Sequence, residues 1–143
     1  MERKHKEITK GFVEPMPRKQ FLRLMKEFKE TGGRYIANEQ SEAYLDIRGA
    51  EAITLNSTTI IFRRRPSRAA VFEELFHVMQ FREGKIDYTM RNKYECEIEA
   101  KEYLINNAET LELSQLEIKQ TRESLDMYRI KLDELKGEEY DGM

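Results

Sequence analysis

Apolar side chains return every three or four residues in the first third of the chain. The members of this set are Phe21, Leu22, Leu24, Met25 and Phe28. Their spacing places them on one face of a helix that begins near residue 17, and the pair Gly32–Gly33 is expected to end it. The residues after this pair predict a short strand over 34–37 and a short helix over 41–47, which Gly49 ends.

Two short runs rich in β-branched residues follow, at 52–55 and 59–62. Asn56 and Ser57 separate the runs, which is the pattern of a β-hairpin. Ser67 then occupies the position of a helix N-cap, and apolar residues continue at helical spacing as far as Gly84. We therefore expect a helix over about 67–83 after the hairpin.

The last third of the chain predicts two longer helices. The first spans about 92–111, and the second begins at a capping box from Ser114 to Glu117 and runs to about residue 135, before Gly137. The apolar residues of the second helix step by three and four, as in a seam that packs on another helix. They are Ile118, Thr121, Leu125, Tyr128, Leu132 and Leu135.

Together these elements predict an α+β fold, in which a small antiparallel sheet (the hairpin at about 51–62) packs with about four helices. A chain of 143 residues has the length of one domain. We expect residues 1–16 to form a leader or a strap, residues 17–137 to form a single domain, and residues 138–143 to form an acidic tail.

Charge and composition narrow the range of functions. The 25 basic and 27 acidic residues give a net charge of -2, which argues against a general nucleic-acid or membrane-surface binder but leaves room for a local basic patch. Cys96 is the only cysteine, so no internal disulfide can form. No stretch approaches the roughly 18 apolar residues of a membrane helix, so we expect no membrane insertion.

The helix at about 67–83 carries its candidate chemistry on one polar stripe. At about 100° per residue, apolar side chains cover most of its circumference, so the helix should be largely buried. The remaining stripe holds Glu73, His77 and Gln80, with Glu74 at its edge. Buried charged groups need partners or a metal ion. Two plainer interpretations stay open, because the stripe could be solvated or His77 could be a structural histidine.

One carboxylate of the next helix lies on an unexpected face. Glu97 points into the apolar arc of this helix, where an ionised carboxylate needs a cation, a histidine or a metal ion. Lys101, one turn further on, could pair with Glu97. Alternatively, Glu73, His77 and Glu97 converge as metal ligands with Glu74 beside them. Zinc accepts such nitrogen and oxygen ligands, and a neighbouring glutamate can act as general base.

These residues resemble the motifs of the zincin-like metallopeptidases. That superfamily carries His-Glu-x-x-His on one helix and a third ligand on a later helix, often within Glu-x-x-Ala. The corresponding residues here are Glu73-Glu74-Leu75-Phe76-His77, followed by Gln80, and Glu97-Ile98-Glu99-Ala100. In particular, the stretch 63–103 resembles zincin-like domains of bacterial polymorphic toxins and of prophage-encoded proteins.

The resemblance implies that His77 and Glu97 are the second and third metal ligands and that Glu74 is the general base. Glu73 stands where the family has its first ligand, a histidine. Because oxygen replaces nitrogen at this position, the site could hold zinc, could favour manganese, or could hold no metal.

The resemblance also suggests that the α+β fold is a minimal zincin-like one, and it suggests a function. We expect a metal-dependent hydrolase of the metallopeptidase type that acts on a protein or peptide as a bacterial or phage effector or toxin domain, with an immunity protein as a partner. It would be cytoplasmic, or delivered into a target cell within a larger effector. One alternative is a catalytically inactive zincin-like protein that binds a partner protein. A further alternative is a nuclease toxin, in which His77 and Glu73 or Glu74 form an acid/base pair.

A cluster of arginines would serve the nuclease alternative. Arg63, Arg64, Arg65 and Arg68 surround the start of the helix at 67–83, where basic groups can contact phosphate. Arg64, Arg65 and Arg68, together with Gln80, are therefore candidate substrate or phosphate contacts. A solvated turn is the simpler interpretation of this cluster, and nucleic acid is the less expected partner.

Overall fold

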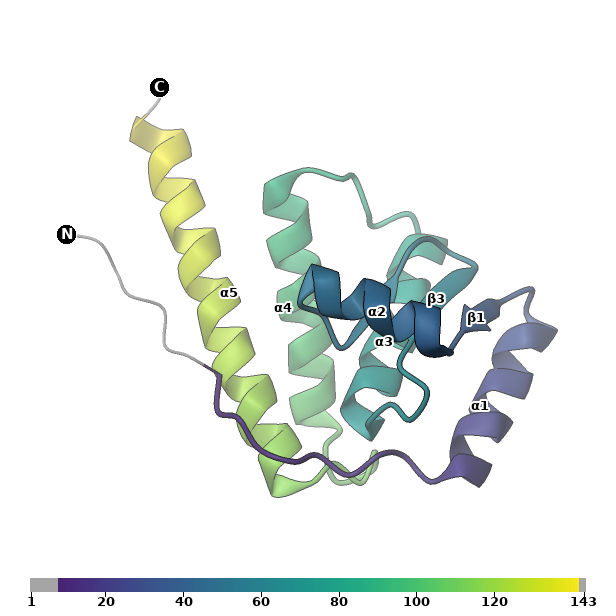
Figure 1. Ribbon diagram of the computed structural model, residues 1–143. Helices are drawn as coiled ribbons and strands as arrows, with labels where there is room; N and C mark the ends of the chain where they lie inside the picture. Colours follow the sequence, from purple (N-terminus) through teal and green to yellow (C-terminus); the bar gives the residue numbers. More distant parts are fainter. Residues whose placement is uncertain (1–7, 142–143) are drawn as a thin grey trace. The chain divides into compact units, whose positions relative to one another are not determined.

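The computed structural model describes residues 8–141, and the side chains of residues 8–139. Along these residues five helices and three strands follow one another (Figure 1), which confirms the predicted α+β class. The chain forms two compact units. One consists of residues 13–84, and the other combines residues 8–12 with residues 85–141.

The sheet of the first unit is mixed rather than purely antiparallel. Strands β1 (Arg34–Ile36), β2 (Ala52–Thr54) and β3 (Thr59–Phe62) lie in the order β1-β3-β2. β2 and β3 pair antiparallel, which confirms the predicted hairpin, whereas β1 pairs with β3 in parallel. A parallel pair needs a long crossover connection, and helix α2 (Glu39–Arg48) followed by β2 provides it. The expectation of an antiparallel sheet was therefore wrong for β1.

Helices α1 (Arg18–Glu30) and α3 (Arg68–Arg82) supply most of the remaining core of this unit. Phe21 of α1 packs edge-on against Tyr35 of β1 and Phe62 of β3, with ring centroids 5.4 and 5.5 Å away. All four residues of the central strand β3 are buried. The buried apolar cluster consists of Met16, Phe21, Met25, Phe28, Ile60, Phe62, Val71 and Val78.

Local capping determines where two of these helices begin. The backbone N–H of Ser41 donates to Asn38 Oδ1, and the N–H of Asn38 donates to Ser41 Oγ, both at 2.8 Å. This capping box starts α2 at Glu39, ahead of the predicted position 41. Ser67 caps α3 as expected, because its hydroxyl oxygen accepts from the N–H of Ala70 at 3.1 Å.

Helices α4 (Met90–Asn106) and α5 (Gln115–Asp141) form most of the second unit and lie side by side (Figure 1). Within the predicted seam of α5, Thr121 and Leu125 are buried. The predicted end of α4 near residue 111 was wrong. The side chain of Asn107 donates to the carbonyl oxygen of Tyr103 at 2.8 Å and so satisfies a terminal carbonyl of the helix.

α5 begins at the predicted capping box. The N–H of Ser114 donates to Glu117 Oε1 at 3.0 Å, and the N–H of Glu117 donates to Ser114 Oγ at 3.1 Å. The helix does not stop before Gly137, contrary to expectation, but continues to Asp141. A glycine inside a helix costs only about 1 kcal/mol relative to alanine, and an ion pair of 3.1 Å between Arg91 of α4 and Glu139 holds the last turns.

Near the N-terminal end of the described chain, the segment around Thr9 is bound to α5. The N–H and the hydroxyl of Thr9 both donate to the Glu123 carboxylate of α5 at 2.6 Å, and Gln120 donates to the carbonyl oxygen of Thr9 at 2.9 Å. Residues 1–7 of the predicted leader and residues 142–143 of the predicted tail lie outside the described residues. The division into leader, single domain and tail stays a prediction.

No helix in the described part of the chain is both long enough and apolar enough to cross a lipid bilayer.

Candidate metal centre

Four candidate residues of the polar stripe lie on α3, in the first unit. Glu74, His77 and Gln80 are buried, and Glu73 is half-buried. The prediction that α3 is largely buried is therefore confirmed, and the interpretation of its polar stripe as a solvated face is wrong for three of the four residues. Glu73 and His77 are four residues apart, so they share one face of the helix on successive turns.

His77 has a fixed orientation. Its side chain is 8% exposed, and its Nδ1 atom lies 2.7 Å from Oε1 of the fully buried Gln80. Because a carboxamide oxygen only accepts hydrogen bonds, Nδ1 carries the proton and donates it. The lone pair then resides on Nε2, which is the arrangement found in metal-ligating histidines, whose second nitrogen donates to a neighbouring oxygen.

The carboxylate of Glu74 points to the sheet. Glu74 is 5% exposed, and its Oε1 accepts a hydrogen bond of 3.0 Å from the hydroxyl of Thr54 in β2. The same hydroxyl lies 3.1 Å from the carbonyl oxygen of Glu74. Thr54 was not among the candidate residues, since a threonine in a predicted strand carries no signal of a contact with a helix.

Glu97 lies on α4, in the second unit, and its predicted alternative partner is present. Lys101 Nζ lies 2.6 Å from Glu97 Oε2, and the side chains of Lys101 and Glu97 are 6% and 21% exposed. Lys101 Nζ also lies 5.0 Å from the ring centroid of Tyr128 in α5. The ion pair involves one carboxylate oxygen, and a carboxylate offers a second oxygen to another partner.

By their chemistry, Glu73, His77 and Glu97 are residues of the kind that could hold a metal ion. The group offers one imidazole nitrogen and two carboxylates. Zinc is bound by such mixed sets, and manganese favours sets richer in oxygen, so the donor set fits both metals and does not choose between them.

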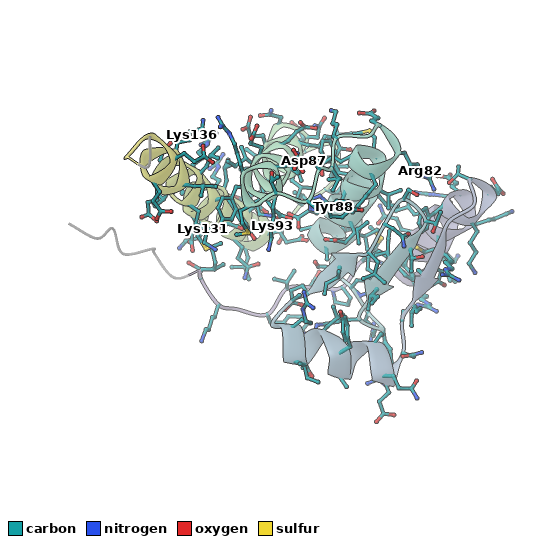
Figure 2. All side chains as sticks on the ribbon, turned by 90° about the horizontal axis from the view of Figure 1, so that it is seen from above. Arg82, Asp87, Tyr88, Lys93, Lys131 and Lys136 are labelled. Atoms are coloured by element: carbon teal, nitrogen blue, oxygen red, sulfur yellow. The ribbon has the colours of Figure 1, made fainter. Side chains whose placement is uncertain are left out.

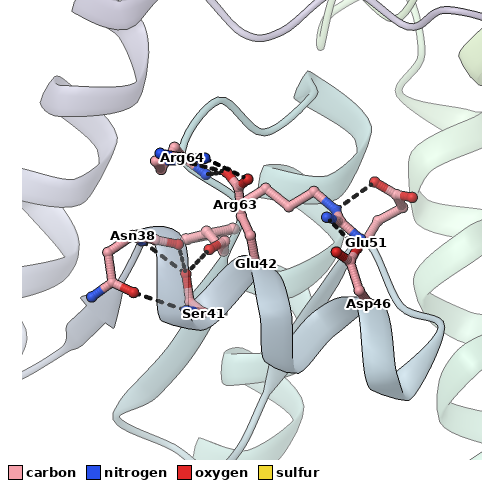
Figure 3. Close-up of polar contacts among 8 residues, drawn as sticks. Asn38, Ser41, Glu42, Asp46, Glu51, Arg63 and Arg64 are labelled. Carbon is pink, nitrogen blue, oxygen red and sulfur yellow. Dashed lines mark hydrogen bonds and ion pairs between the residues drawn. The ribbon is translucent and has the colours of Figure 1, made fainter.

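Two arginines of the predicted cluster form ion pairs with acidic side chains. Figure 3 shows Arg64 paired with Glu42 of α2, at 3.0 Å, and Arg63 paired with Asp46 and Glu51, at 2.9 and 3.3 Å. Since these guanidinium groups already face carboxylates, they are poorly suited to contact phosphate. This pairing was not foreseen, because the partners are separated along the chain.

The other two candidate arginines have different surroundings. Arg68 Nε donates to Gln20 Oε1 of α1 at 3.4 Å. Arg65 is exposed and makes no ion pair with any described residue.

The pair of Arg64 and Glu42 leads to a prediction about pH. Hydrogen bonds from the Arg64 side chain, and then from its backbone N–H, lower the pKa of Glu42 from 4.5 to about 2. We expect Arg64→Met to return the pKa of Glu42 toward 4.5, which an NMR titration of the Glu42 carboxyl carbon would measure. Because the folded-state pKa is depressed, the pair stabilises the fold above about pH 4.5, and this contribution is lost as the pH falls toward 2.

Arg65→Met is the matched control for this titration, because it removes a neighbouring guanidinium that does not contact Glu42 by any described interaction. If Glu42 titrated alike in both variants, the ion pair would not be the cause of its low pKa.

Cys96 is a poor candidate for a nucleophile. Its side chain is buried, and burial raises the pKa of its thiol, as do the nearby carboxylates of Glu99, Glu97 and Glu95. A raised pKa leaves little thiolate at neutral pH.

Comparison of the chain with protein-family models, with curated proteins and with solved structures finds no match. The resemblance to zincin-like metallopeptidases therefore rests on the motif residues alone.

Proposed function

We propose that this protein is a metal-dependent hydrolase of the metallopeptidase type. The observation that carries the proposal is the buried His77, whose Nδ1 is bound by the buried Gln80. Keeping two polar side chains in the interior requires satisfied hydrogen bonds. A hydrogen bond that sets the histidine tautomer is what a metal ligand requires, and Glu73 lies one turn away on the same face.

In this proposal Glu73 and His77 from α3 and Glu97 from α4 hold one divalent metal ion. The ion, when bound, would supply Lewis acidity toward the carbonyl group of a substrate. Glu74 would accept a proton from the attacking water and pass it to the leaving group. Thr54 would keep the Glu74 carboxylate in place through its hydrogen bond of 3.0 Å.

The biological setting is proposed from the motif resemblance. We infer a bacterial or phage effector or toxin domain whose substrate is a protein or peptide and whose partner would be an immunity protein. It would act in the cytoplasm of the cell that makes it or in the cytoplasm of a target cell. Zinc is the first choice of metal, with manganese as the alternative.

A second candidate function is a zincin-like protein without catalysis that binds a partner protein. The ion pair between Lys101 and Glu97 favours this candidate, because it gives Glu97 a partner without any metal. The nuclease alternative is less well supported, because Arg63 and Arg64 are engaged with acidic side chains.

Metal content tests the first proposal. We expect the purified protein to bind about one equivalent of zinc or manganese, and we expect His77→Ala and Glu97→Gln each to lose it, as measured by elemental analysis and by titration of the metal. Glu74→Gln should keep the metal and lose hydrolysis of labelled casein by roughly 10²–10⁴-fold, the usual contribution of a general base.

His5→Ala is the control for the loss of a histidine, because His5 and His77 are the two histidines of the chain. Circular dichroism would show that each variant is folded. Folded variants that bind metal as the parent does, or a parent that takes up none, would contradict the hydrolase and leave the binding protein as the better candidate.

A further inference from the structure

Helix α1 exposes a row of positive charges. Its 13 residues include five basic and two acidic ones. Phe21 and Phe28 on one side are buried in the core of the first unit. On the opposite side Lys19, Arg23 and Lys26 are exposed on successive turns, because their spacing of four and three residues keeps them on one face.

None of Lys19, Arg23 and Lys26 makes an ion pair with a described residue. Like charges on neighbouring turns repel one another, and the two glutamates of α1, each one turn after a member of the row, offset only part of this repulsion. Some basic side chains elsewhere do have acidic partners, in the pairs Arg63–Asp46, Arg64–Glu42, Lys85–Glu99, Arg91–Glu139, Lys101–Glu97 and Arg129–Glu102.

A second segment brings two arginines to the start of α1. The N–H of Met16, just before the helix, donates to the carbonyl oxygen of Pro66 at 2.8 Å. Arg65 and Arg68 flank this contact, and Arg68 Nε donates to Gln20 of α1 at 3.4 Å. The backbone contact and this hydrogen bond therefore bring residues 65–68 close to the first turn of α1.

We propose that this basic surface, defined by Lys19, Arg23, Lys26, Arg65 and Arg68, binds the phosphate backbone of a nucleic acid. Along α1 the row extends over about 10 Å, at 1.5 Å per residue. A linear row of cations suits a linear polyanion, and contacts of lysine and arginine with phosphates provide affinity without reading sequence. The proposal is independent of the metal site, so either can fail alone.

An anionic membrane fits this surface less well. Amphipathic helices bind membranes by inserting their apolar face at the lipid boundary. The apolar face of α1 is instead occupied by the protein core, where Phe21, Met25 and Phe28 are 1–5% exposed. On the exposed side of α1, Leu22 is a large apolar side chain and is 45% exposed. A single side chain offers little apolar area for insertion into a membrane.

The test is fluorescence anisotropy with a short labelled DNA duplex and a short labelled RNA, over about 50–200 mM salt. The parent protein should bind at least one of them, with an affinity that falls steeply as salt rises. The variant Lys19→Gln/Arg23→Gln/Lys26→Gln should bind at least about tenfold more weakly. On duplex DNA its salt slope should be shallower by about 3, since each lost phosphate contact removes about 0.9.

The control variant Lys93→Gln/Lys119→Gln/Lys136→Gln removes the same charge from exposed positions of the second unit, where Figure 2 shows Lys93 and Lys136 on α4 and α5. It should bind as the parent does. Circular dichroism checks that both variants are folded. Absence of binding by the parent, equal weakening by both variants, or binding only to phosphatidylserine vesicles would each overturn the proposal.

Discussion

Replacing Lys101 with methionine is expected to lower the free energy of unfolding by about 3 kcal/mol. Removing one partner of a buried ion pair costs about 3–5 kcal/mol, because the other charge stays buried without compensation. The lower value applies here, since the Glu97 side chain is 21% exposed and has interactions besides this ion pair. Methionine preserves the apolar stem of the lysine, so the loss reports the charge. Urea denaturation followed by circular dichroism would measure it.

The double variant Glu97→Gln/Lys101→Met separates the charge from other effects of the substitution. Because the pair is then neutral, most of the lost stability should return. Zinc provides a second comparison: if Glu97 is a ligand, zinc should raise the melting temperature of Lys101→Met more than that of the parent, since the carboxylate is no longer shared with a lysine. Equal responses to zinc would indicate that the pair is purely structural.

Phe21→Ala is expected to lower the free energy of unfolding by about 3–5 kcal/mol, the usual cost of truncating a buried phenylalanine. Phe21 is 1% exposed, and its ring contacts those of Tyr35 and Phe62, so its removal opens a cavity between α1 and the sheet. Domains are typically stable by about 5–15 kcal/mol, so the variant would lose a large part of its stability. The midpoint of urea denaturation would measure the change.

The neighbouring residue offers the control. Leu22 is 45% exposed, and Leu22→Ala should change stability by no more than about 0.5 kcal/mol. The sequence analysis placed Leu22 on the apolar face together with Phe21, and its exposure corrects that expectation. Similar losses in both variants would mean that α1 is not anchored by its buried residues Phe21, Met25 and Phe28.

The elements that local sequence determines were predicted well. The start of α3 at Ser67 and the capping box at Ser114 follow from hydrogen bonds between residues three positions apart. The parallel pairing of Tyr35 with Ile60 could not be predicted in this way, because it joins residues that are distant in the sequence. The continuation of α5 beyond Gly137 likewise depends on another helix.

In the candidate site, too, contacts within one helix could be predicted and contacts between distant residues could not. Helical spacing was sufficient to place Glu73, His77 and Gln80 together and to name Lys101 as an alternative partner of Glu97. The contact of Thr54 with Glu74 joins a strand to a helix 20 residues later, and no spacing rule reports such a contact. The acidic partners of Arg63 and Arg64 were missed for the same reason.

The contact of Thr9 with Glu123 has a consequence for folding during synthesis. The two residues are 114 positions apart, and ribosomes add about 5–20 residues per second. Thr9 would therefore wait roughly 6–20 s for its partner to be made. Residues 13–84 are complete long before that and contain their own apolar core. We expect this internal part to collapse first, while the segment around Thr9 joins α5 only after Glu123 has been made.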